Sequence, residues 1–187
     1  MKSWSEFNTE EPELAEIGRH LLCRSRAHIG LAFLATLRKD GAPRLHPVSL
    51  VFYMDRLYVL IPPTSPKCAD LSRDGRYAMQ AFPSPVGAEN EEFYLAGRAE
   101  CIRDLTVRQA LVTGTEIHVD ESEVLFELLL DRLMYTRLVN LDTPDEHPLH
   151  RMWRASGHPP PSEDIPFRIH PLSCELLYDR RKLQQFG

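Results

Sequence analysis

The sequence predicts a mainly β protein in which consecutive antiparallel hairpins are flanked by helices. Three apolar runs of strand length follow one another within residues 31–82, and they are LAFLATLR, RLHPVSLVFY and LYVLI. The turns between them, residues 39–43 and 54–56, are so short that neighbouring strands can only run antiparallel. A fourth run, residues 77–82, follows after a short helix. Together these segments predict a strand meander that could enclose a ligand.

A helix before the first strand is predicted over residues 10–24. Leu14, Ile17 and Leu21 recur at helical spacing, and Pro12 is tolerated in the first turn of a helix. An amphipathic helix of this kind needs one buried face. We therefore expect it to pack against the strands as a lid, rather than to form a surface for a partner.

A second helix is predicted to begin at Pro66, directly after the third strand. Ser65 is a favourable N-cap residue, and a proline suits the first helical position because its missing N–H would be unbonded there anyway. The helix should end near Asp74 and Gly75, because a glycine can adopt the left-handed conformation that closes a helix.

The start of this helix is a candidate anion site. Its free N–H groups and the positive end of its dipole favour an anion, and Thr64, Ser65 and Lys67 add two hydroxyl groups and an ammonium group. Arg44 and His46 begin the second strand and share one of its faces, so that Arg44 could close over the same anion. The residues alone leave another interpretation open, in which Ser65 only caps the helix while Lys67 and Arg44 are solvated.

The fourth and fifth strands carry two further signals. Gln80 stands out among apolar neighbours and could hydrogen-bond a bound ring, although a solvent-exposed glutamine is the commoner outcome on a strand. Residues 83–91 indicate an irregular loop. A half-buried strand is predicted over residues 93–101, in which Gly97 permits a bulge.

The second half of the chain is less regular in its pattern. Asp104 is predicted to cap a helix, and residues 124–139 fit a helix or a strand equally well. We expect a loop rich in proline and histidine over residues 142–164 and a C-terminal extension over residues 165–187. The whole chain, 1–187, is expected to form a single domain.

Composition excludes several classes of function. A formal net charge of −5 argues against binding to nucleic acid. The longest apolar run is too short to span a bilayer and no targeting segment is evident, so we expect a cytoplasmic protein without membrane contact. The cysteines form no CxxC pair and suggest reduced thiols, with Cys68 and Cys101 on buried faces. The spacing of histidines and acidic residues predicts neither a metal site nor a hydrolytic centre.

Residues 33–82, with EEFYLAGRAE after them, resemble the pyridoxamine phosphate oxidase-like family of flavin-binding split barrels. The resemblance covers about residues 1–140 and is strongest in the segments ATLRKDGAPRLHPV and TSPKCADL. It implies a β-barrel with flanking helices, an FMN-binding split barrel with antiparallel, Greek-key-like strands. It also favours a strand over residues 124–139, because relatives close the barrel with a comparable segment.

The resemblance implies a set of cofactor-binding residues. In the family, the equivalents of Arg44, Ser65 and Lys67 hold the phosphate of flavin mononucleotide (FMN), and backbone of the second and third strands lines the isoalloxazine ring. The ring-lining positions are Val48, Ser49 and Leu60. The full candidate set is Arg44, His46, Val48, Ser49, Leu60, Thr64, Ser65, Lys67 and Gln80.

The implied function is that of an FMN-dependent oxidoreductase acting on a small molecule of unknown identity. No catalytic side chain is predicted, because the flavin ring itself accepts and releases hydride. The family's substrate-binding RxH element has no clear counterpart near the C-terminus, so vitamin B6 oxidation is not expected. Two alternatives remain open: a reductase that uses a deazaflavin on the same barrel, and a non-catalytic protein that binds flavin or haem.

The expected working unit is a homodimer with two cofactor sites, each built by both chains. Relatives cover the flavin with a second subunit, and one small meander offers too few walls for a planar ring. Trp153 and Arg154 combine an aromatic plate with a cation, as interface anchors do. In the alternative interpretation, Trp153 folds back onto its own barrel.

Overall fold

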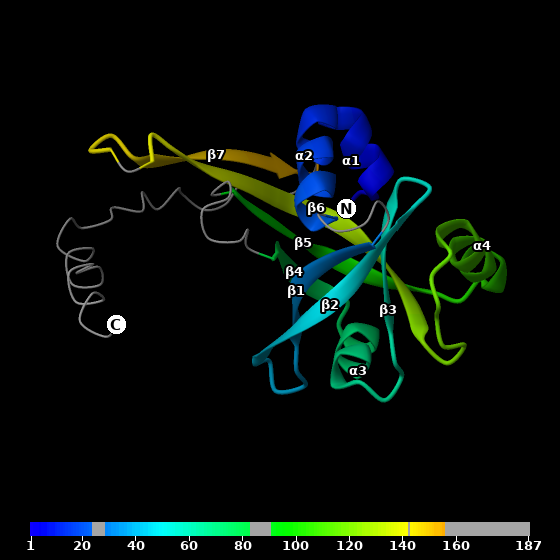
Figure 1. Ribbon diagram of the computed structural model, residues 1–187. Coiled ribbons are helices and arrows are strands. Elements are labelled where there is room, and N and C mark those ends of the chain that lie inside the picture. The colour runs from blue at the N-terminus through cyan, green and yellow to red at the C-terminus, as the bar shows by residue number, and fades with distance from the viewer. Residues whose placement is uncertain (24–28, 83–90, 142, 156–187) are drawn as a thin grey trace, which may run out of the picture.

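The computed structural model describes residues 1–23, 29–82, 91–141 and 143–155, and within them the fold is a closed antiparallel barrel (Figure 1). Strands follow the order β3-β2-β1-β4-β5-β6-β7, and β3 also pairs with β6, which closes six of them into a ring and leaves β7 outside it. The predicted β-barrel with flanking helices is confirmed. The strands are β1 (Ile29–Leu37), β2 (Pro43–Tyr53), β3 (Arg56–Ile61), β4 (Arg76–Ala81), β5 (Glu91–Ile102), β6 (Val124–Val139) and β7 (His147–Arg154). The helices are α1 (Trp4–Glu10), α2 (Pro12–Leu22), α3 (Pro66–Arg73) and α4 (Leu105–Thr115).

Two tight turns produce the predicted hairpins. Met54 and Asp55 both have positive φ, at 46° and 55°, which is the backbone of a two-residue hairpin turn. In the turn before β2, Gly41 has φ 84°, and a carboxylate oxygen of Asp40 accepts a hydrogen bond from the N–H of Ala42 at 3.1 Å. Turn chemistry therefore fixes the register of the first three strands.

Strand β6 settles the ambiguity over residues 124–139. It is one long strand that pairs with β3, β5 and β7, so the strand favoured by the family resemblance is confirmed. Its register against β5 shifts between Ala96 and Gly97, which is the predicted bulge. A side chain at Gly97 would place its Cβ 1.9 Å from the carbonyl oxygen of Leu129, so only glycine allows this close backbone approach.

The prediction of a loop over residues 142–164 is wrong for residues 147–154, which form β7. Residues 147–154 pair along β6 as an outer strand, and Pro148 is tolerated because an edge strand does not need every N–H for pairing. Trp153 on β7 is 7% exposed and packs against Phe7 at a centroid distance of 4.8 Å. It folds back onto its own barrel, so its interpretation as an interface anchor is also wrong. Residues 156–164 and the extension 165–187 lie outside the described residues.

Helices α1 and α2 cover one end of the barrel and α3 covers the other (Figure 1). The helix predicted over residues 10–24 is α2. Helix α1 was not predicted, although its signal is present: the hydroxyl of Ser3 accepts from the N–H of Glu6, whose side chain accepts from the N–H of Ser3. Trp4 and Phe7 of α1 are buried in the aromatic core beneath it.

Helix α3 begins at Pro66 as predicted but ends differently. It stops at Arg73, and the next residue, Asp74, has extended backbone with φ −136°. Gly75 does not have positive φ, so its predicted role as a left-handed cap is wrong. It is needed for space, because a Cβ there would lie 2.6 Å from the carbonyl oxygen of Ala99.

Two expectations about exposure can also be compared with the structure. Cys68 is buried as expected, whereas Cys101 is exposed, because it lies where β5 leaves the barrel core. Among the residues that the structure describes, no helix is long and apolar enough to cross a membrane.

Candidate functional site

A cleft of about 910 Å³ lies on the outer side of β2 and β3. One wall consists of these strands and of the start of α3, and the facing wall is the connection that leads from α4 to β6. The volume is within the range of small-molecule and cofactor sites. The cleft is lined by Ile29, Pro47, Val48, Ser49, Val51, Leu60, Pro62, Lys67, Thr115, Glu116, Ile117, His118, Val119 and Glu123.

Four of the predicted residues line this cleft. They are Val48, Ser49, Leu60 and Lys67. Ser49 lies on the exposed outer face of β2, whereas Val48 faces the barrel interior and reaches the cleft at its edge. The structure thus brings the predicted ring-lining strands and the predicted lysine into one cavity.

The first turn of α3 has the features of an anion site. Ser65 occupies the N-cap position, but its hydroxyl makes no capping hydrogen bond. Its N–H donates to the carbonyl oxygen of Pro62 at 2.9 Å, which closes the preceding turn. Thr64 is exposed beside it, and Lys67 is half-buried in the helix. The two hydroxyl groups and the ammonium group therefore stand at the positive end of the helix dipole.

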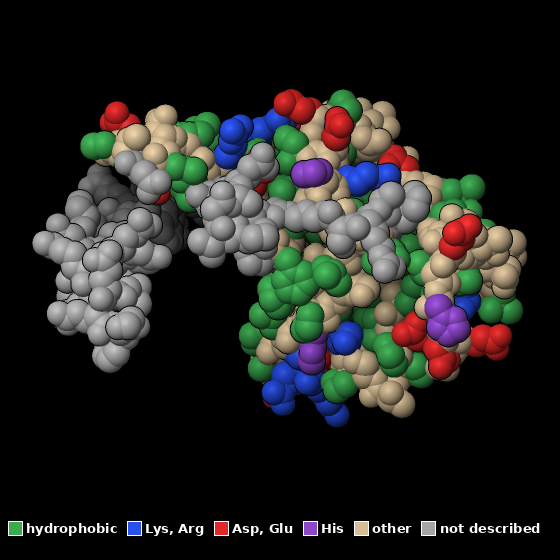
Figure 2. Space-filling model, viewed as in Figure 1, with side chains coloured by type: hydrophobic (Ala, Val, Ile, Leu, Met, Phe, Trp, Pro, Cys, Tyr) green, Lys and Arg blue, Asp and Glu red, His purple; other side chains and the backbone are tan. Residues whose placement is uncertain are grey.

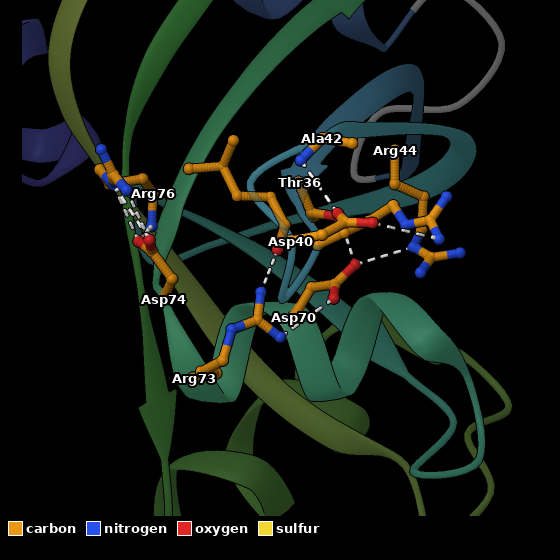
Figure 3. Close-up of polar contacts among 10 residues, drawn as sticks. Thr36, Asp40, Ala42, Arg44, Asp70, Arg73, Asp74 and Arg76 are labelled. Atoms are coloured by element: carbon orange, nitrogen blue, oxygen red, sulfur yellow. Dashed lines mark hydrogen bonds and ion pairs between the residues drawn. The ribbon is translucent and has the colours of Figure 1, made fainter.

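Arg44 belongs to a polar network behind this turn (Figure 3). Its Nε donates to Oδ2 of Asp70 at 2.8 Å, and the same oxygen accepts from the hydroxyl of Thr36 at 3.1 Å. Arg73 donates to the other carboxylate oxygen at 3.3 Å. The network joins β1, β2 and α3. Four of the predicted residues are not among those that line the cleft, and they are Arg44, His46, Thr64 and Ser65.

His46 follows Arg44 on the same face of β2. Burial lowers its pKa below the ordinary value of 6.5, and the positive charges of Lys67 and Arg44 lower that pKa further, against the opposing charge of Asp70. Its Nε2 atom is buried and has no hydrogen-bond partner within the described part of the chain. A neutral ring with an unused nitrogen thus lies near the two cations that the sequence predicted to hold an anion.

The low pKa of His46 makes stability depend on pH. The unfolded chain takes up a proton at this residue before the folded chain does, so the free energy of unfolding is expected to fall as the pH drops below about 6.5. Urea denaturation between about pH 8 and pH 5 measures this, and a His46→Gln variant should show a shallower fall. His147→Gln, which removes an exposed histidine, is the control. Equal pH dependence in the wild type and both variants would contradict the assignment.

Gln80 does not line the cleft. It lies on the outer face of β4, opposite Phe33 of β1 and Tyr94 of β5. The structure of one chain therefore does not bring Gln80 together with the other candidate residues, and its contact with a ring stays a prediction.

The facing wall of the cleft, residues 115–119 with Glu123, was not predicted. Arg108 of α4 holds this connection by donating to the carbonyl oxygens of Asp120 and Glu123, the former at 2.7 Å. Glu116 ends α4 in the left-handed conformation with φ 53°. The wall adds two carboxylates and His118 to a cleft that is otherwise mostly apolar. No local motif in the sequence links it to the second and third strands.

Metal binding finds no support in the described residues. They contain no group of three or more histidine, cysteine, aspartate or glutamate side chains that could hold an ion. His147 and His150 are three positions apart on a strand, which directs them to opposite faces. His150 makes a hydrogen bond with Thr136 at 3.0 Å.

No family model matches the sequence, and no curated protein matches it. Solved structures do match the fold. An FAD-binding protein from Mesorhizobium loti has a TM-score of 0.51 and 20% identity, covering 65% of this chain and 92% of its own. HupZ from Group A Streptococcus has a TM-score of 0.51 and 14% identity, covering 63% of this chain and 90% of its own.

A haem-binding protein from Mycobacterium smegmatis also matches, with a TM-score of 0.49 and 16% identity over 63% of this chain. The match spans only 52% of the length of that protein. At these identities the two matches with a TM-score of 0.51 show a shared barrel fold and no more. The fold and the cleft together define a closed antiparallel barrel with a candidate ligand site on the outer face of β2 and β3.

Proposed function

We propose that the chain binds FMN in this cleft and acts as an FMN-dependent oxidoreductase related to the pyridoxamine phosphate oxidase-like family. One observation carries the proposal: Lys67, at the start of α3, lines the same cavity as Val48, Ser49 and Leu60. A phosphate group at the helix start and a flat ring along β2 and β3 would then occupy one continuous space.

The residues present fit such a cofactor. The strand wall is apolar and Lys67 lies at one end of it, which suits a planar ring with a phosphate tail, while Glu116, His118 and Glu123 lie in the facing wall. Lys67 and Ser65 would hold the phosphate, and the unpartnered Nε2 of His46 could gain a hydrogen bond at that end. A bound flavin would supply hydride transfer, and the chain would supply affinity, orientation and exclusion of water from one ring face.

The comparison with solved structures supports a flavin more generally. The Mesorhizobium loti protein, which shares the barrel fold, is described as FAD-binding. We place the activity in the cytoplasm as part of the same proposal.

Binding of FMN and riboflavin to the purified full chain tests the proposal. FMN is expected to bind more tightly by at least about tenfold, because riboflavin lacks the phosphate that Lys67 and its neighbours would hold. Quenching of flavin fluorescence measures both affinities. Equal affinities would remove the basis for the phosphate site. The visible spectrum of the protein as purified separates FMN from the alternatives, since a deazaflavin absorbs at shorter wavelength and haem gives a Soret band.

We further propose that two chains form a homodimer that completes each cofactor site. Hydrophobic side chains gather on the outer face of the barrel over β1 and its neighbours (Figure 2). Leu31 and Leu45 are 46% and 64% exposed on this face, and the rings of Phe33 and Phe82 pack edge to face at 4.3 Å. An exposed apolar patch of this kind is typical of an interface. Gln80 lies beside Phe33, so it would approach the cofactor of the partner.

Light scattering at low micromolar concentration tests the dimer. The expected result is a mass of two chains, with Leu45→Glu shifting the protein toward the monomer because it places a charge in the apolar interface. A wild-type protein that remains monomeric while it retains FMN would show that one chain is sufficient.

A further inference from the structure

The buried carboxylate of Asp70 is the most fully hydrogen-bonded acidic group near the candidate anion site. It is 4% exposed and accepts from Thr36 and Arg44 on one oxygen and from Arg73 on the other, at distances of 3.1, 2.8 and 3.3 Å. The three donors come from β1, β2 and α3. Figure 3 shows that Asp70 points from the helix toward the ends of these strands.

The charge of Asp70 opposes the function proposed for its surroundings. Burial raises its pKa, but hydrogen bonds from Arg44, Thr36 and Arg73 outweigh burial, so the net shift of the pKa is downward. The carboxylate is therefore ionised at neutral pH. By Coulomb's law alone, a buried negative charge close to a bound phosphate weakens the binding of that phosphate. A negative charge at this position must therefore have a role that outweighs its unfavourable effect on phosphate binding.

The geometry of Arg44 supplies that role. Arg44 is bound to Asp70 through Nε, which leaves the two terminal nitrogens of the guanidinium without another partner among the described residues. The guanidinium of an arginine commonly donates two parallel hydrogen bonds to one phosphate group, and its terminal nitrogens can serve as donors. The Arg44 side chain is 27% exposed and belongs to a long, flexible residue type, so fixing it in advance lowers the entropy lost on binding.

The carboxylate of Asp70, which binds Arg44, is itself held in place by Arg73. Arg73 donates to Asp70 and also to the carbonyl oxygen of Leu37 at the end of β1, which ties α3 to the barrel. Thr36 is 2% exposed and anchors the other oxygen. The carboxylate therefore cannot turn away from Arg44 without breaking buried hydrogen bonds.

We infer that Asp70 is a positioning residue, which orients the guanidinium of Arg44 so that its terminal nitrogens face a phosphate monoester at the start of α3. The inference rests on the proposed function, because the phosphate belongs to the proposed FMN. The charges of Lys67 and Arg44 lower the pKa of His46 and the charge of Asp70 raises it, as expected for groups that lie near one another.

Asp70→Ala in the full chain tests the inference through the ratio of the affinities for FMN and riboflavin. Positioning predicts that this ratio falls about tenfold, while the affinity for riboflavin is unchanged. A purely electrostatic effect predicts the opposite sign, because a negative charge near the phosphate is removed. A purely structural effect lowers both affinities and leaves the ratio unchanged. A ratio that is unchanged or higher therefore overturns the inference.

Two further variants keep the test decisive. Asp74→Ala removes a carboxylate at the end of α3 that pairs with Arg76 at 2.6 Å and not with Arg44, so it should leave the ratio unchanged. An equal fall in this variant would overturn the inference, because loss of any nearby charge would then suffice.

Arg44→Lys keeps the positive charge but loses the Nε donor, and it decides the matter if Asp70→Ala does not fold. A wild-type ratio in Arg44→Lys would show that a held guanidinium is not needed. If the wild-type chain itself does not bind FMN, the proposed function fails and the positioning role fails with it. A wild-type chain that prefers FMN, together with an unchanged ratio in Asp70→Ala, overturns the positioning role alone.

Discussion

Replacing Lys67 with alanine is expected to weaken FMN binding by about tenfold to a hundredfold. The ammonium group lies in the cleft wall at the positive end of α3, where it would face the phosphate. Loss of one charge-assisted contact of this kind removes about 1.5–3 kcal/mol of binding free energy. Arg44→Ala should have an effect of similar size. Lys67 is partly exposed, so its truncation opens no core cavity and the barrel should remain folded. Arg44→Ala also removes one of the three hydrogen bonds to the buried carboxylate of Asp70, so circular dichroism must show that this variant is folded.

The controls for this prediction distinguish lost contacts to the phosphate from lost contacts to the ring. Affinity for riboflavin should be nearly unchanged in both variants, because neither cation is expected to contact the ring. Lys39→Ala removes an exposed lysine from the turn before β2 and should leave the affinity for FMN unchanged. If Lys67→Ala and Arg44→Ala both retain wild-type affinity for FMN, these side chains are ordinary surface and network residues.

The helix start at the candidate site could be predicted because its chemistry is local. A proline after a serine sets the start of α3, and Lys67 follows within the first turn, so spacing alone brings these groups together. The partner of Arg44 could not be predicted. Asp70 is one residue among many acidic residues in the sequence, and only the packing of α3 against the ends of β1 and β2 brings it within 2.8 Å of Arg44.

Strands that are joined by tight turns could be predicted from the sequence. Strands that pair with segments far away in the sequence could not. Met54 and Asp55 form a short turn between two apolar runs, which the sequence pattern predicts. The bulge at Gly97 is also predictable, because the glycine itself permits it. By contrast, β7 forms because the free edge of β6 offers it a ladder of hydrogen bonds, although its own sequence contains Pro148 and two histidines. The wall over residues 115–119 depends on Arg108 in the same way, through contacts that no local pattern records.

The stability of the barrel should depend heavily on Trp4, a residue outside every predicted element. Trp4 is 1% exposed, and its ring contacts Phe52 and Phe7 at centroid distances of 4.8 and 5.4 Å, both edge to face. It thus joins α1 to the strand that carries Arg44 and His46. Trp4→Ala is expected to lower the free energy of unfolding by about 3–5 kcal/mol, a large part of the total for a domain of this size.

Urea denaturation followed by circular dichroism measures this loss, and Leu105→Ala provides the matched control. Leu105 is 77% exposed on α4, away from the proposed dimer interface, so its truncation should change the free energy of unfolding by less than about 0.5 kcal/mol. A loss below about 1 kcal/mol in Trp4→Ala would mean that α1 is not docked on the barrel in solution. A large loss with normal FMN affinity in the remaining folded protein would separate the two ends of the barrel. The aromatic packing under α1 and α2 would then be a main source of stability, while the other end of the barrel, at α3, carries the groups proposed to bind the phosphate.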